Sequence, residues 1–122
     1  MIADRVAAVR ERIARAAARA RRRPEEVTLV AVSKTHPAEA VREAFDAGVR
    51  HFGENKVQEA EPKVGALAAL RGQGLRWHLV GHLQANKARA AVALFDRIDS
   101  VDDARLGGRL ERAAEELRKL GR

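Results

Sequence analysis

Four short apolar segments, each followed by a helix-like stretch, constrain the fold of this 122-residue chain more than any other feature. The segments begin near residues 27, 49, 76 and 97, so about 20 to 27 residues separate one from the next. This spacing suits a strand, a crossover helix and a return to a parallel strand. The first segment, 27–32 (VTLVAV), is continuous and β-branched, which is typical of a strand buried on both faces. We therefore predict an α/β protein with a parallel sheet.

Helices are predicted between the strands. Pro37 begins one of them, and Gly48 follows its end as the residue in the left-handed conformation. The next helical stretch contains Pro62 and Gly65, at which we expect it to break or restart. Another helix begins at about Asn86, and a last amphipathic helix follows the fourth strand.

Two architectures fit this order: an open doubly wound sheet and a β/α barrel. No glycine-rich dinucleotide motif follows the first strand and no phosphate-binding lysine loop is present, so the nucleotide-binding versions are disfavoured. The length suits one domain. We divide it into a basic amphipathic helix, 1–23, and the β/α units, 27–122. The chain has no cysteine, which excludes disulfides and thiolate chemistry.

The positive charge is concentrated at the N-terminus. Residues 1–23 contribute +6 of the formal net charge of +7, and their apolar residues recur at helical spacing until Pro24. We expect a helix that packs on the domain with a solvated basic face. Contact with nucleic acid or an anionic surface and an organellar transit peptide are the alternatives. Because the segment lacks aromatic residues for base stacking, we do not expect nucleic acid to be the partner. With neither a secretory signal nor a membrane span in the sequence, we expect a cytoplasmic chain.

Polar residues stand at the ends of the four strands: Lys34, Asn55, His82 and Ser100, with His78 inside the third. Functional groups gather at the carboxyl ends of strands in parallel α/β folds. Lys34 follows the largely apolar run 27–32 and Ser33, where desolvation favours the neutral amine that Schiff-base chemistry requires. The alternative is a lysine that simply leaves the strand into solvent.

The other strand-end residues have simpler interpretations. Asn55 is a candidate cap of the following helix, and Ser100 a candidate turn residue. His78 and His82 have the spacing of a zinc pair, but on a strand their Cα atoms are about 13 Å apart. We therefore predict no metal site and interpret at least one histidine as packed or facing a site.

Four motifs in order resemble the pyridoxal 5′-phosphate homeostasis proteins, the proline-synthetase co-transcribed homologue group. The resemblance covers residues 5–110, and the motifs are LVAVSKTHP (29–37), FGENKVQEA (52–60), WHLVGHLQANK (77–87) and Ser100-Val101-Asp102. It implies an alanine-racemase-like (β/α)8 TIM barrel, here truncated to an N-terminal helix plus about four β/α units. It also implies that Lys34 binds pyridoxal 5′-phosphate (PLP) as a Schiff base, with Asn55 and His78 near the cofactor pocket.

The resemblance further implies a function in vitamin B6 homeostasis without catalysis by the protein itself. The alternative is a PLP-dependent amino-acid racemase, which needs a second acid/base group, commonly tyrosine. This sequence contains no tyrosine. His36 stands where many relatives carry a second lysine.

The family's second half, which supplies the groups around the cofactor phosphate and pyridine nitrogen, has no counterpart in the sequence. We therefore expect weak PLP binding by this chain alone. Half a barrel exposes strand edges, so we also expect self-association through them.

Overall fold

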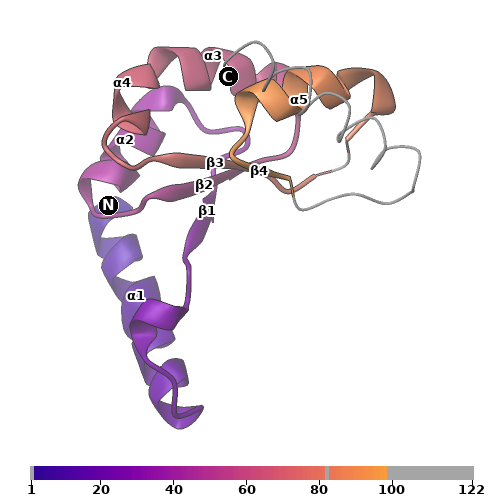
Figure 1. Cartoon of the computed structure of the whole chain (residues 1–122). Helices are drawn as coiled ribbons and strands as arrows, with labels where there is room; N and C mark the ends of the chain where they lie inside the picture. Colours follow the sequence, from indigo (N-terminus) through magenta and orange to yellow (C-terminus); the bar gives the residue numbers. More distant parts are fainter. Residues whose placement is uncertain (1, 82, 99–122) are drawn as a thin grey trace.

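The computed structural model describes residues 2–81 and 83–98, and Figure 1 shows a parallel sheet with helices packed along it. In chain order, the elements are α1 (Ile2–Arg19), the 3₁₀ helix η1 (Pro24–Glu26), β1 (Val30–Val32), α2 (Ala38–Asp46), β2 (His51–Glu54), α3 (Val57–Ala66), α4 (Ala68–Arg71), β3 (Arg76–Leu79), the 3₁₀ helix η2 (Ala85–Lys87), α5 (Ala88–Leu94) and β4 (Arg97–Ile98). The last predicted helix, His82 and Ser100 lie outside the described residues.

The strands follow one another across the sheet in chain order, β1-β2-β3-β4, and every pair is parallel. Helices α2, α3, α4 and α5 all lie on the same side of this sheet in Figure 1. A doubly wound sheet reverses its strand order and carries helices on both faces, whereas the wall of a β/α barrel does neither. Of the two architectures that the sequence allowed, the structure therefore has the barrel arrangement.

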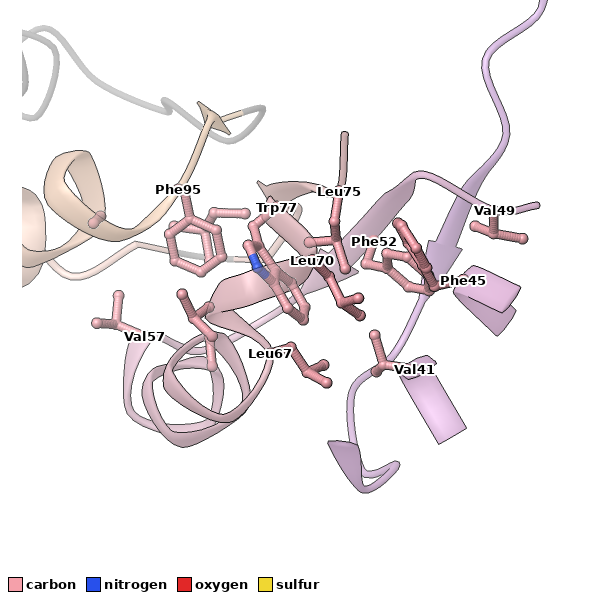
Figure 2. Close-up of a cluster of buried hydrophobic side chains, with 14 of the residues drawn as sticks. Val41, Phe45, Val49, Phe52, Val57, Leu67, Leu70, Leu75, Trp77 and Phe95 are labelled. Atoms are coloured by element: carbon pink, nitrogen blue, oxygen red, sulfur yellow. The ribbon is translucent and has the colours of Figure 1, made fainter. Parts of the chain in front are cut away.

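The core lies between the sheet and these helices. Phe52 and Trp77 are register partners on β2 and β3, are 1% and 0% exposed, and have ring centroids 5.9 Å apart. Figure 2 shows them gathered with Leu67 and Leu70 from the α3–α4 segment. Because side chains alternate along a strand, the neighbours of Phe52 and Trp77 point to the opposite face of the sheet.

The predicted strand positions are confirmed, but the first strand is shorter than expected. We predicted 27–32, whereas β1 begins at Val30. Its neighbour β2 begins at His51, the register partner of Val30, so residues 27–29 have no ladder partner in the described sheet. The apolar residues there are not enclosed: Val27 remains 37% exposed. The β-branched run therefore exceeds the length that the partner strand can pair.

The predicted break at Pro62 is wrong. Helix α3 runs through Pro62 and Gly65, and the interruption comes at Leu67, before α4. Pro62 is exposed and removes only one hydrogen bond of the helix ladder. Burial of the apolar face offsets that loss, and this face consists of Val57, Ala60 and Val64.

The predicted role of Gly48 is confirmed. Its φ is +103°, and its amide donates to the carbonyl of Phe45 (2.9 Å). The amide of Val49 donates to the carbonyl of Ala44 (3.1 Å). These two bonds close the last turn of α2 in the way that a left-handed residue permits. A Cβ atom at Gly48 would meet nothing within 4 Å, so glycine is favoured there by conformation rather than by space.

Helix α1 ends in the same way, but with arginine in the glycine position. Arg21 has a φ of +56°, and the amides of Arg21 and Arg22 donate to the carbonyls of Ala18 and Ala17. The helix thus ends at Arg19 instead of the predicted residue 23. It packs against α2, with a hydrogen bond from the Arg10 guanidinium to a carbonyl of the α2 terminus. No helix within the described residues is both long and apolar enough to cross a membrane.

The substitution Arg21→Gly should stabilise the fold. A left-handed conformation costs an L-residue about 1–2 kcal/mol, and the greater freedom of glycine in the unfolded chain removes part of that gain. We expect the free energy of unfolding to rise by about 0.5–1 kcal/mol, measured by urea denaturation. The matched control Arg15→Gly, in the exposed middle of α1, should lower it by about 1 kcal/mol. Equal effects of the two variants would contradict the assignment.

Candidate functional site

The ends of β1 and β2 bring Lys34 and Asn55 to one edge of the sheet. Val32 pairs with Gly53, and Lys34 and Asn55 each follow two residues later along neighbouring strands. Adjacent strands are about 4.8 Å apart, so the two positions are close in the fold. Two of the three predicted site residues therefore lie just beyond the carboxyl ends of neighbouring strands, at the edge where parallel α/β folds place their sites.

The side chain of Lys34 is exposed. The largely apolar run 27–32 precedes it, but the last residue of that run, Val32, is itself 52% exposed. The desolvation that we expected from this run is therefore not supplied by the described part of the chain. In the described residues Lys34 is an exposed amine at the end of the first strand, accessible to reagents.

Asn55 is half-buried beside a cleft of about 360 Å³ at the carboxyl ends of β2 and β3. The cleft is lined by the residues after both strands, the start of α3 and the end of η2. Gln58, Gln84 and Lys87 contribute polar groups, and Val57 and Leu83 contribute apolar ones. Asn55 does not cap α3: the N-cap residue is Lys56, without a side-chain cap hydrogen bond. The interpretation of Asn55 as a helix cap is therefore wrong.

Gly81 leaves room for the backbone of Asn55 at the cleft wall. A Cβ atom on Gly81 would lie 2.7 Å from the carbonyl oxygen of Asn55 and 2.8 Å from its Cα atom. Both are backbone atoms, so they have no rotamer by which to move away. Glycine at this position is needed for the close approach of the two strand ends.

The substitution Gly81→Ala should displace Asn55 and destabilise the chain. Forcing a methyl group into a closed contact costs about 1–3 kcal/mol. The matched control is Gly65→Ala, because a Cβ there meets nothing within 4 Å and α3 gains a better helix former. We expect that control to raise the free energy of unfolding by about 0.5–1 kcal/mol in urea denaturation. Opposite signs support the contact, whereas stabilisation by both variants would refute it.

His78, the third predicted residue, lies two residues earlier along the sheet than Asn55. It pairs in register with Gly53 and is 6% exposed. Its Nε2 atom lies 2.8 Å from Nδ1 of His51, and the two rings meet edge to face with centroids 5.0 Å apart. His78 is thus a packed histidine on the sheet face opposite Trp77.

His51 is not among the predicted site residues, although its alternation with Phe52 along the second strand places it on the face opposite the core. Among the described residues, no three histidine, aspartate or glutamate side chains form a group that could hold a metal ion. The predicted absence of a zinc site formed by His78 and His82 stays a prediction, because His82 lies outside the described residues. The observed neighbour of His78 is the imidazole of His51.

Burial, followed by the charges of His78 and Arg76, lowers the pKa of His51 below its ordinary value of 6.5, and Asp96 opposes this in part. In the unfolded chain His51 binds a proton at about that ordinary value. The folded chain binds it only at lower pH. The unfolded state therefore holds more protons in this window, and the fold loses stability as the pH falls from 6.5 through the lowered pKa.

The variant His51→Gln should weaken this pH dependence. We expect the free energy of unfolding of the unmodified chain to fall more steeply than that of the variant as the pH decreases from 6.5. Urea denaturation at several pH values measures both slopes. His36→Gln is the control, since His36 is exposed in the loop after β1. Parallel curves for the unmodified chain and His51→Gln would contradict the assignment.

A buried charge network lies next to Lys34, and sequence analysis missed it as well. The Glu54 carboxylate is 0% exposed, and Nζ of Lys63 lies 3.0 and 3.2 Å from its two oxygens. The same ammonium donates to the carbonyl of Ser33 (2.7 Å), and the Ser33 hydroxyl donates to Glu54. One sequence signal indicates the network: Lys63 stands three residues after Ala60, so it lies on the buried stripe of its helix.

Comparison with known proteins identifies relatives that are named pyridoxal phosphate homeostasis proteins. No protein-family model matches the chain. A pyridoxal phosphate homeostasis protein of Escherichia coli strain K12 is 49% identical over 116 residues, which are 93% of this chain and 50% of the relative. Another, from Synechocystis sp. PCC 6803, is 47% identical over 97 residues, which are 80% of this chain and 44% of the relative. The chain is homologous to about half of a pyridoxal phosphate homeostasis protein.

Solved structures agree with this relationship to the homeostasis proteins. PipY of Synechococcus elongatus PCC7942, solved with PLP bound, is 51% identical, with a TM-score of 0.82 over 96% of this chain and 50% of its own. A protein of unknown function from Bifidobacterium adolescentis is 35% identical, with a TM-score of 0.87 over 94% of this chain and 50% of its own. The predicted fold class, a truncated β/α barrel, is confirmed. The chain spans about half the length of the curated relatives it matches.

Proposed function

We propose that this chain is the lysine-bearing part of a PLP-binding protein that serves PLP homeostasis, and that Lys34 is the residue that attaches the cofactor. The observation that carries the proposal is the place of Lys34, an accessible amine at the carboxyl edge of a β/α barrel sheet, after the strand that neighbours the one before Asn55. The shared name of the relatives and the PLP bound to PipY support it.

The described residues fit the aldehyde end of the cofactor. When bound, PLP supplies an aldehyde that condenses reversibly with an amine. Lys34 would hold the cofactor through its amine, the group that condenses with that aldehyde. The Asn55 amide, from the neighbouring strand end, offers both a donor and an acceptor for groups on the ring. We place His78 in the same pocket, at its base on the sheet, where the imidazole of His78 contacts that of His51.

Reversible attachment without further chemistry is what a carrier of the cofactor requires. We propose that the chain catalyses no reaction of its own. A racemase on this kind of fold needs an acid/base group on the opposite face of the cofactor, and the sequence lacks the tyrosine that commonly supplies it. Deuterium exchange at the α-carbon of alanine tests this point, and we expect no rate above that of free PLP.

Binding by this chain alone should be weak, because the groups that we expect around the phosphate belong to a half that the chain does not match. A cytoplasmic location and self-association through the sheet edges remain predictions of the same proposal. The edges are real features of the structure, since β1 and β4 each pair with one described strand.

Borohydride trapping tests the attachment site. We expect PLP to produce visible absorbance with the chain, and reduction to leave most of the label on Lys34 in peptide maps. Lys34→Arg keeps the charge but removes the primary amine, so it should lose most of the label. The matched control Lys56→Arg changes another exposed lysine and should keep the label on Lys34.

Labelling spread evenly over the lysines, or retained by Lys34→Arg, would refute the proposal for Lys34. A label that moves to one other lysine would refute the site but leave PLP binding intact.

A further inference from the structure

The backbone on both sides of Lys34 is fixed by side chains of one helix. On the N-terminal side, Ser33 donates from its amide to the carbonyl of Gly53 (2.8 Å) and accepts at its own carbonyl from Lys63. On the C-terminal side, the amide of Thr35 donates to the Glu59 carboxylate. Lys63 and Glu59 both belong to α3 and lie four residues apart, on adjoining turns.

Lys63 connects the two anchors. Its ammonium contacts the Ser33 carbonyl at 2.7 Å, the Glu54 carboxylate at 3.0 Å and Glu59 Oε1 at 3.6 Å. An ammonium has three protons, and its three hydrogen bonds go to the Ser33 carbonyl and the two oxygens of Glu54, whereas Glu59 is paired with it by charge. The side chain of Lys63 is only 10% exposed, and that of Glu54 is fully buried. A buried ion pair satisfied in this way has one arrangement of low energy.

Thr35 shows that the anchors act on the backbone. Its φ is +66°, in the left-handed region that β-branched residues avoid. Such a conformation persists only when surrounding contacts hold it. Two contacts are in place here: the amide of Thr35 donates to Glu59, and the amide of His36 donates to the Ser33 carbonyl across the same turn (3.1 Å). The bond from Thr35 is also the first cause that lowers the pKa of Glu59, ahead of the charge of Lys63.

We propose that Lys63, with Glu54 and Glu59, positions Lys34 for attachment of PLP by holding the backbone at Ser33 and Thr35. The proposal rests on the proposed function of Lys34. Lys63 and both glutamates are positioning residues, since they act through the loop rather than on the cofactor. The side chain of Lys34 stays exposed and able to react, while its Cα atom is held in place relative to β2 and Asn55.

The substitution Glu59→Ala tests the anchor without touching the buried ion pair. The matched control is Glu61→Ala, an exposed glutamate on the same helix. We expect amide hydrogen exchange at Thr35 to become on the order of tenfold faster in Glu59→Ala. We expect the share of trapped PLP on Lys34 to fall several-fold toward that of the other lysines. Glu61→Ala should change neither quantity, and both variants should keep the melting temperature within a few degrees.

A conservative variant separates positioning from general disturbance. Glu59→Gln keeps an oxygen that accepts the Thr35 amide but loses the charge beside Lys63. It should restore most of the slow exchange and most of the label on Lys34. The buried part is tested by the pair Glu54→Gln with Lys63→Met, which leaves no unpaired charge in the core. The pair should fold, yet exchange faster at residues 33–36 and lose selectivity for Lys34.

The two readouts distinguish the possible failures. Unchanged exchange at Thr35 in Glu59→Ala would overturn the anchor itself. Faster exchange with an unchanged share of label on Lys34 would overturn its effect on PLP attachment. If the unmodified chain shows no preference for Lys34, the proposed function fails, and the positioning proposal fails with it, although hydrogen exchange would still report whether Glu59 holds the loop.

Discussion

The buried carboxylate of Glu54 is the constraint on which the arrangement around Lys34 depends. A fully enclosed carboxylate is tolerated only when it is paired and hydrogen-bonded. Glu54 ends β2, Lys63 comes from α3 and Ser33 follows β1, so three parts of the chain must meet to satisfy it. No buried side-chain nitrogen or oxygen in the described residues lacks a hydrogen-bond partner. The carboxylate thereby connects the sheet, one helix and the lysine loop into a single unit.

The order of strands and helices was predictable from the sequence because it follows from short-range patterns. The apolar runs, Gly48 and the proline at the start of α2 depend on residues within a few positions of one another. Errors arose where a distant segment decides the outcome. The length of β1 is set by where β2 begins, and α3 continues through Pro62 because its other face is buried against the sheet. Neither constraint is visible within a local window of sequence.

The site residues also divide into those that local sequence patterns indicate and those that depend on distant segments. The position of Lys34 at a strand end is a local feature, and the four motifs made its role a specific expectation. The contacts of Lys63 with Ser33 and of His51 with His78 span 30 and 27 residues. They require the register of the parallel sheet, which the sequence does not state. A charged residue on an otherwise apolar helix stripe is a useful signal in such cases, because a buried lysine implies a buried acid elsewhere.

Positioning and desolvation of Lys34 have different origins in this chain. Positioning is local to the first two β/α units, since every group in the network falls between Ser33 and Lys63. Desolvation is not, because Lys34 and Val32 are both exposed in the described residues. A preformed attachment point lowers the entropy lost when the cofactor binds, but an imine in water remains open to hydrolysis. If Lys34 attaches the cofactor as we propose, selectivity for it should be a property of the described β/α units, whereas tight retention would require groups that cover the cofactor from elsewhere.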